Sequence, residues 1–282
     1  MTRLSRPVVP VLLVALWAPA SAAAQQSAPP QPAAITLSPE QMEAFLLRAE
    51  IVRTRDAEGG ITNTQRATLS DGIVTHDAQI QTIDQAKPVF KPPAGPPEYN
   101  FTDSYRFNVA GYRVARLLGL DNVPMSVERV IDGKRAAVTW WIDDVLMDER
   151  TRLKKPVESP DRARTAMQVH IMRVFDELIQ NRDRNLGNLL WTTDWKMWMI
   201  DHTRAFRIGA HLLNPKLLER VERSLLEHMR ALTQETVGSA AGRSLTRFEI
   251  QSLLARRDAI VTLFEARIAE RGERAVLYTL PR

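Results

Sequence analysis

Residues 181–190 read NRDRNLGNLL, and residues 199–206 read MIDHTRAF. Between these stretches, the apolar runs LLW and MWMI flank the turn TTDWK, a pattern that predicts a short β-hairpin. Such a hairpin returns the chain to its starting point and brings Asp183, Asn188 and Asp201 together. The amide oxygen of Asn188 and the carboxylate of Asp201 suit Mg²⁺ or Mn²⁺ bound with phosphates and water. Asp183 then remains available to orient or deprotonate an attacking hydroxyl, as phosphoryl transfer requires.

Taken one at a time, these residues have ordinary structural explanations. Asp183 could cap the loop or pair with a neighbouring arginine, Arg182 or Arg184, and such exposed ion pairs are common and weak. Asn188 alone suits a turn, and Arg204 is interpreted as an internal partner of Asp183 or Asp201. The prediction of a site therefore rests on the set rather than on any single member.

The composition is that of an ordinary globular protein. The 282 residues include no cysteine, 44% are hydrophobic and 25% are charged, and the formal net charge is +5. The absence of cysteine excludes disulfides and thiol chemistry. Basic residues are scattered among acidic ones, so nucleic acid is not an expected partner. No G-x-S-x-G motif occurs, and the five histidines show no metal-binding spacing.

The first 24 residues have the pattern of a secretory signal peptide: Arg3 and Arg6, an apolar run at 8–17, then small residues at 20–24. The predicted localisation is therefore exported, either periplasmic or secreted. A membrane anchor is the alternative, although the apolar run is shorter than the roughly 20 residues of a spanning helix. Residues 25–38, rich in Pro, Ala and Gln, are predicted to be a linker.

The next part of the chain has strand patterns around one helix. A capping box at Ser38 begins a short helix. Turns at Gly59-Gly60 and at 70–72 separate the expected strands, a proline-rich loop is expected at 87–100, and a helix is expected at 102–118. Asp132-Gly133 joins two further strands, a strong hairpin signal. The expected strands are 51–55, 65–69, 72–76, 78–84, 123–130 and 136–142.

The remainder is predicted to be mainly helical. Residues 161–180 have apolar side chains at helical spacing, Asn214-Pro215 is expected to cap another helix, and Thr246 with Glu249 caps a third. The predicted fold class is α+β. A mostly β amino-terminal lobe with one helix spans 39–142, and a helical lobe spans 143–282.

These motifs resemble the protein-kinase-like fold. Asp183-x₄-Asn188 followed by Ile200-Asp201 resembles its catalytic loop and metal-binding aspartate. DRNLGN resembles the DRxxxN loop of phosphatidylinositol 3-/4-kinase-like proteins, and residues 201–206 resemble the D-x-G-R-x-F ending of secretory-pathway casein kinases. The resemblance covers roughly residues 50–210 and implies a two-lobed fold that uses ATP and Mg²⁺ or Mn²⁺ to phosphorylate a hydroxyl acceptor, which could be a protein, a lipid or a small molecule.

The resemblance also implies roles for individual positions. Asp183 corresponds to the catalytic aspartate, and the metal ligands are Asn188 and Asp201. The positions next to the nucleotide are Gly59, Gly60 and Thr62 over the phosphates, Trp141 to Asp143 beside the adenine, and Gln81 and Asn108 at the phosphate-gripping pair. A plain hairpin turn remains an alternative for Gly59-Gly60.

Two of these positions depart from the family pattern. Kinases grip the phosphates with a strand lysine that is paired with a helix glutamate, whereas this chain has Gln81 and Asn108. A Gln–Asn hydrogen bond could keep the geometry without supplying charge. Lys91, in the sequence FKP, is an alternative phosphate lysine.

Three functions therefore remain open. The first is an exported, metal-dependent phosphotransferase. The second is a pseudokinase that binds a nucleotide or a protein partner, which the neutral pair and the export signal favour. The third is a small-molecule phosphotransferase of the aminoglycoside-kinase type, in which Arg182 stands where a histidine is usual.

Overall fold

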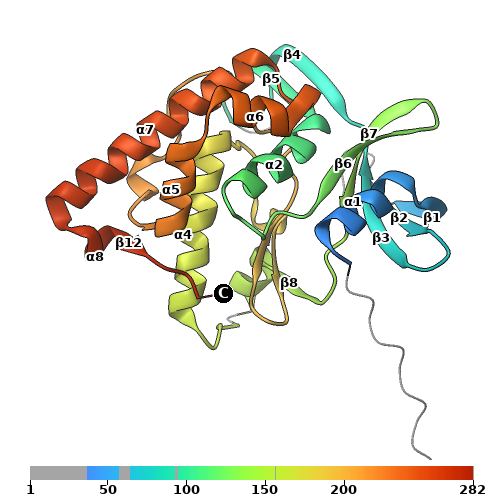
Figure 1. The fold of residues 1–282 in the computed structure, drawn as a ribbon, viewed down its shortest axis with the longest axis horizontal. Coiled ribbons are helices and arrows are strands. Elements are labelled where there is room, and N and C mark those ends of the chain that lie inside the picture. The colour runs from blue at the N-terminus through green and yellow to red at the C-terminus, as the bar shows by residue number, and fades with distance from the viewer. Residues whose placement is uncertain (1–36, 57–63, 93–94, 156, 282) are drawn as a thin grey trace, which may run out of the picture. The chain divides into compact units, whose positions relative to one another are not determined.

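A five-stranded antiparallel sheet forms most of the amino-terminal lobe in the computed structural model, which describes residues 37–56, 64–92, 95–155 and 157–281 (Figure 1). Its order is β1-β2-β3-β7-β6. Asp132 and Gly133, both at positive φ, turn β6 into β7, which confirms the predicted hairpin. The strands are β1 Glu50–Asp56, β2 Gln65–Ser70, β3 Thr75–Gln81, β6 Ser126–Ile131 and β7 Lys134–Trp140.

Two helices pack against this sheet. α1 (Pro39–Arg48) starts at the predicted capping box of Ser38 and Gln41, and its Phe45 meets Trp140 of β7 edge to face. α2 (Arg106–Leu117) packs against β6 and β7 and ends at Gly119, whose positive φ suits a glycine. Strand side chains alternate between the two faces, and the buried Gln81 of β3 points to the face on which it meets Asn108 of α2.

The predicted loop at 87–100 is wrong. β4 (Asp84–Phe90) and β5 (Glu98–Ser104) form an antiparallel hairpin, drawn in cyan at the top of Figure 1. Pro88 has no backbone N–H to donate, and a two-stranded sheet tolerates it because each strand has an open edge. Stacking of Phe90 on Phe101, with ring centroids 4.4 Å apart, supports the pairing. As β5 continues to Ser104, α2 begins four residues later than expected.

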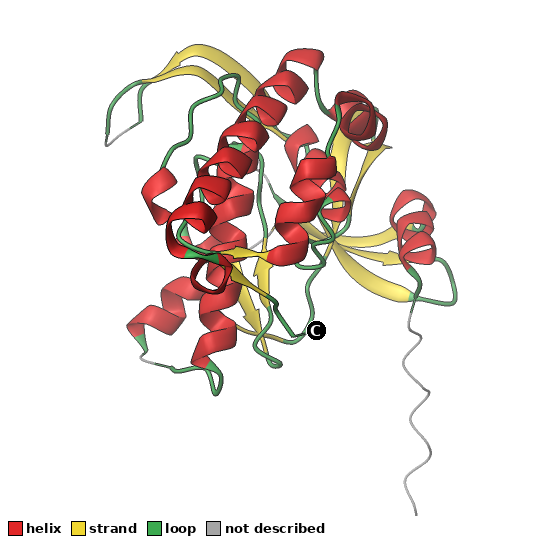
Figure 2. Ribbon diagram, turned by 60° about the vertical axis from the view of Figure 1, so that its left-hand side comes forward, coloured by secondary structure: helices red, strands yellow, loops and turns green. Residues whose placement is uncertain are grey.

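Two long helices organise the carboxyl-terminal lobe and confirm the sequence prediction. α4 (Arg162–Ile179) is capped by Asp161, and α7 (Arg247–Arg271) begins with the capping box of Thr246 and Glu249. The two helices pack against each other (Figure 2). Beside α4 lies a three-stranded sheet in the order β10-β9-β8, with β8 Val145–Asp148, β9 Leu189–Thr192 and β10 Met197–Met199.

Arg256 ties this lobe to the segment that follows residue 206. It lies at the middle of α7 with no exposed surface and donates hydrogen bonds to the carbonyls of Leu178, Arg207 and Gly209 at 2.8, 2.9 and 2.6 Å. Burial lowers the pKa of this guanidinium to about 10. A charge is therefore kept in the core to satisfy carbonyls where α4 ends and the chain turns.

Two smaller predictions fail. The strand expected at 72–76 starts only at Thr75, because the turn takes the residues before it. Asn214-Pro215 opens a single 3₁₀ turn rather than a long helix, and α5 begins at Arg223 with Glu222 as its cap. The remaining elements are α3 Glu149–Lys154, η1 Leu186–Asn188, η2 Pro215–Leu217, β11 Val221–Glu222, α5 Arg223–Ala231, α6 Gln234–Ala241, η3 Gly242–Ser244, α8 Glu273–Val276 and β12 Leu277–Tyr278.

The predicted signal peptide at 1–24, and the linker up to residue 36, lie outside the described residues. Within the part of the chain that is described, no helix is both long and apolar enough to cross a bilayer. The described chain is α+β, with a β-rich amino-terminal lobe and a helical carboxyl-terminal lobe.

Candidate functional site

The β9–β10 hairpin brings residues 188 and 200 side by side, as its sequence predicts. β9 and β10 pair antiparallel with Leu189 opposite Met199. Just beyond the pair, the backbone N–H of Ile200 donates to the carbonyl of Asn188 at 3.0 Å. Asn188 and Asp201 therefore lie at the same end of the hairpin, next to the loop that carries Asp183.

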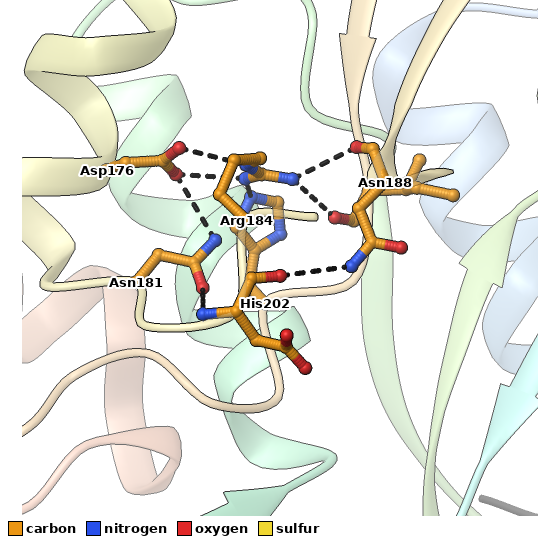
Figure 3. Close-up of polar contacts among 7 residues, drawn as sticks. Asp176, Asn181, Arg184, Asn188 and His202 are labelled. Carbon is orange, nitrogen blue, oxygen red and sulfur yellow. Dashed lines mark hydrogen bonds and ion pairs between the residues drawn. The ribbon is translucent and has the colours of Figure 1, made fainter. Parts of the chain in front are cut away.

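Arg184 holds this arrangement together (Figure 3). Its Nε and Nη2 donate to the two carboxylate oxygens of Asp176, both at 2.9 Å, and its Nη1 donates to the carbonyls of Asn188 and Ile200 at 3.0 and 2.8 Å. Only 10% of the arginine side chain is exposed. Arg184 thus pairs with Asp176 on α4 rather than with Asp183, and it sets the spacing between the two predicted metal ligands.

His202 completes the same network. Arg184 Nη2 lies 3.0 Å from His202 Nε2, and burial, together with this guanidinium, lowers the pKa of the imidazole well below its usual range. The ring is neutral, so Nε2 can accept a hydrogen bond from Arg184. Gly111 of α2 packs against the ring so closely that a Cβ there would lie 3.2 Å from His202. α2 therefore rests directly on the residue that follows Asp201.

Asp183 and Asp201 differ in their surroundings. The Asp183 side chain is 45% exposed and lies 3.5 Å from Nη1 of Arg204, which confirms Arg204 as its partner. Asp201 adopts a left-handed backbone (φ +54°) and accepts a hydrogen bond from the Thr203 hydroxyl at 3.0 Å. Burial raises the pKa of Asp201, and the neighbouring Asp183 carboxylate raises it further. The exposed Asp183 carboxylate is accessible to a substrate. The buried Asp201 carboxylate would be stabilised in its charged form by a bound cation.

The side-chain oxygens of Asn188 and Asp201 suit a metal that also binds phosphates. Asn188 uses its Nδ2 to donate to the carbonyl of Asp183 at 3.3 Å, so its amide oxygen is the atom it can offer. Among the described residues, no three His, Asp or Glu side chains cluster closely enough to hold a metal by themselves. A divalent cation here would take Asn188 and Asp201 with phosphate and water oxygens, which is how Mg²⁺ usually binds.

Gln81 and Asn108 form the neutral pair that their sequence positions suggest. Asn108 Nδ2 donates to Gln81 Oε1, and both side chains are buried. Asn108 Oδ1 in turn accepts the backbone N–H of His202 at 2.7 Å, while Gln81 Nε2 donates to the hydroxyl of Thr64 at 3.3 Å. An uncharged chain of hydrogen bonds therefore runs from β3 through α2 to the Asp201 loop.

A charged pair can be tested at these two positions. We expect Gln81→Lys alone to lower the free energy of unfolding by about 1–3 kcal/mol, because it buries an unpaired cation. Asn108→Asp keeps the acceptor for His202 and supplies the missing anion, so the double variant should be more stable than the two single effects predict, by about 0.5–3 kcal/mol. Urea unfolding of the four proteins measures this coupling; strict additivity would contradict the contact.

Trp141 and Asp143 lie elsewhere, directly after β7. They line a cavity of about 640 Å³ whose walls do not include Asp183, Asn188 or Asp201. Trp141 is covered by Arg66, whose Cζ lies 4.2 Å from the ring centroid, and the Asp143 carboxylate lies 2.6 Å from Nε2 of His76. Their predicted place beside an adenine stays a prediction.

Other predicted positions carry no structural description. Gly59, Gly60 and Thr62 lie outside the described residues. Lys91 directly follows β4 and lies in the loop that joins β4 to β5, as the sequence predicts.

Asp103 of β5 is a site residue that the sequence analysis missed. Its side chain is buried, and its pKa is raised by burial and by the nearby Asp201 and Asp183 carboxylates. The backbone N–H of Ser104 donates to the carbonyl of Thr203 at 2.9 Å, which fixes β5 against the Asp201 loop. The sequence predicted a helix from residue 102, and Asp103 was therefore not considered for the site. Only the observed strand conformation places Asp103 beside the Asp201 loop.

Comparisons with known proteins find similar folds among solved structures. No protein-family model matches the sequence, and no curated protein matches it. Among solved structures, the hydra Fam20 structure "with sugar" superposes with a TM-score of 0.66 at 14% identity, over 85% of this chain and 92% of that one. The Golgi casein kinase superposes with a TM-score of 0.61 at 14% identity, over 86% and 81%. The chain therefore has a Fam20-like, atypical protein-kinase-like fold.

Proposed function

We propose that the chain is an exported atypical kinase, a phosphotransferase that uses ATP and Mg²⁺ or Mn²⁺ to modify a hydroxyl-bearing acceptor. One observation carries the proposal: Arg184 holds Asn188 and Asp201 together beside a solvent-accessible Asp183. A purely structural loop does not need this set of oxygens. The Fam20-like fold supports the same reading, and the export signal rests on the sequence pattern alone.

Each group has a distinct task in this proposal. Asp183, exposed and next to Arg204, orients the acceptor hydroxyl and takes its proton. Asn188 and Asp201 hold the divalent cation, which when bound offsets the charge of the phosphates. Arg184 does not touch the substrate; it positions both ligands through the carbonyl of Asn188 and the carbonyl of Ile200, the residue before Asp201.

A pseudokinase that binds a nucleotide or a protein partner is the second candidate. The observation that favours it is the neutral Gln81–Asn108 pair, which supplies no positive charge to the phosphates. Stabilisation of that charge is usually the largest catalytic contribution. The two candidates differ in phosphoryl transfer rather than in nucleotide binding.

Metal-dependent binding of ATP tests what both candidates share. We expect MgATP or MnATP to raise the unfolding temperature of the wild type, because ligand at about 100 times Kd stabilises by about 2.7 kcal/mol. Asp201→Asn should abolish the metal-dependent part. Asn keeps the left-handed backbone and removes only the charge.

Asp132→Asn is the matched control. Asp132 also has a positive φ (+49°), but it lies in the exposed β6–β7 turn, so the full ligand-induced shift should remain. A wild type that shows no shift with either metal would contradict nucleotide binding in both candidates. A shift that survives Asp201→Asn would remove Asp201 from the metal site.

A further inference from the structure

Asp103 has an acidic side chain that is buried, which is unusual for a strand residue. It comes from the β4–β5 hairpin, only 8% of the residue is exposed, and its Oδ1 is buried without any hydrogen-bond partner. A buried carboxylate oxygen with no donor is costly, since burial removes water and nothing replaces it. Such an atom calls for either a proton or a cation.

The groups around Asp103 supply too few donors. The Thr203 hydroxyl donates to the Asp201 carboxylate at 3.0 Å and also lies beside Asp103. A hydroxyl carries one proton, so it can donate to only one of them at a time. The Ser104–Thr203 backbone bond at 2.9 Å holds the strand in place, so Asp103 cannot move away without breaking it.

The neighbouring cation, Arg204, does not satisfy Asp103. Its Nη2 pairs with Glu98 of the same hairpin and its Nη1 lies 3.5 Å from Asp183, while its buried Nε makes no hydrogen bond. Strand β5 brings the Asp103 carboxylate to the loop that carries Asp201, so a third acidic side chain joins Asp201 and Asp183 there. In the metal-free protein these carboxylates therefore oppose one another, and a divalent cation would remove both the repulsion and the unsatisfied oxygen.

We propose that Asp103 is a further metal ligand, which joins Asp201 in binding Mg²⁺ or Mn²⁺ through its buried Oδ1. The inference rests on the proposed function and extends it, because it makes the β4–β5 hairpin part of the metal centre. Asn108 supplies no negative charge from α2, and Asp103 supplies one from the strand that leads into that helix.

A purely structural role and a metal-binding role for Asp103 predict opposite changes in the unfolding temperature measured in EDTA. If Asp103 only supports the fold, its replacement lowers the unfolding temperature with or without metal. If it is a metal ligand, Asp103→Asn should raise the unfolding temperature in EDTA, because one repelling charge is removed, and should weaken Mn²⁺ binding. We expect a loss of affinity of about 10–100-fold or more, the range found when a group that supports a metal ligand is removed.

The experiment uses Mn²⁺ alone as the probe, with free Mn²⁺ measured by electron paramagnetic resonance and unfolding followed in EDTA. Asp84→Asn is the control, because Asp84 lies on the same hairpin but accepts from Ser104 Oγ at 2.7 Å; it should bind Mn²⁺ like the wild type. Asp103→Ser is a second variant should Asp103→Asn fail to fold, and it should show the same loss of affinity.

The outcomes separate this inference from the proposed function. If Asp103→Asn binds Mn²⁺ as tightly as the wild type while Asp201→Asn does not, Asp103 is not a ligand and the proposed function stands. A lower unfolding temperature of Asp103→Asn in EDTA, with unchanged Mn²⁺ affinity, would overturn the inference in favour of a structural role. If the wild type binds no Mn²⁺ even with ATP present, the inference and the proposed metal-dependent function fail together.

Discussion

Asp183→Asn is expected to reduce phosphoryl transfer by about 10²–10⁴-fold, the usual contribution of a positioned general acid or base. Asparagine has the same shape, but it cannot take a proton from the acceptor hydroxyl. The metal ligands Asn188 and Asp201 are untouched, so the metal-dependent shift in unfolding temperature should remain. Release of labelled phosphate from ATP to water or to added hydroxyl acceptors, under single-turnover conditions, measures the change.

The stability of this variant serves as an internal control. Asp183 is 45% exposed and its contact with Arg204 is long, at 3.5 Å, so its loss should cost less than about 1 kcal/mol in unfolding free energy. Asp132→Asn should transfer phosphate at the wild-type rate. Transfer that survives Asp183→Asn would remove this residue from the chemistry. Wild type that binds MgATP but transfers nothing would favour the pseudokinase.

Arg184→Met is expected to lower the free energy of unfolding by about 3–5 kcal/mol, because it leaves the carboxylate of Asp176 buried without its partner. The Asp176 side chain is only 11% exposed, and the carbonyls of Asn188 and Ile200 lose their donor at the same time. Urea unfolding measures the loss. Arg230→Met is the matched control, since Arg230 pairs with Glu265 at 3.0 Å on the surface and should cost less than about 1 kcal/mol.

A double variant separates stability from positioning. Arg184→Met combined with Asp176→Asn removes the uncompensated charge, so part of the unfolding free energy should return. Asp176 also accepts from Asn181 at 3.2 Å, which the asparagine oxygen can preserve. Metal-dependent nucleotide binding should not return, because no side chain then bridges the carbonyls of Asn188 and Ile200. Full recovery of both properties would show that Arg184 has no positioning role.

Much of the candidate site follows from local sequence. The LLW and MWMI runs around a polar turn have the two-residue period of strands, so the return of the chain from Asn188 to Asp201 could be predicted. Capping residues likewise predicted the starts of α1 and α7, because a cap bonds to backbone only three residues away. The Gln81–Asn108 contact was predicted from the resemblance, and the hydrogen bond confirms it.

Errors arose where pairing or burial outweighed local preference. Five prolines at 87–100 indicated a loop, yet of those that the structure describes only Pro88 lies within a strand, and the hairpin tolerates it at an open edge. The same error placed Asp103 on a helix. The chain after Asn214 shows apolar spacing typical of a helix, but it breaks at β11, where Val221 pairs with Leu277, more than fifty residues away.

The sequence by itself determined which oxygen-bearing residues lie just before β9 and just after β10, at the open end of the hairpin, and where the main helices begin, because strand periodicity and capping act over a few neighbouring residues. Only the tertiary structure decided that Arg184 turns to Asp176 instead of Asp183, that the His202 ring is buried against Gly111, and that β5 brings Asp103 to the Asp201 loop. These contacts depend on burial and on charges brought together from distant segments, so no local sequence pattern can indicate them.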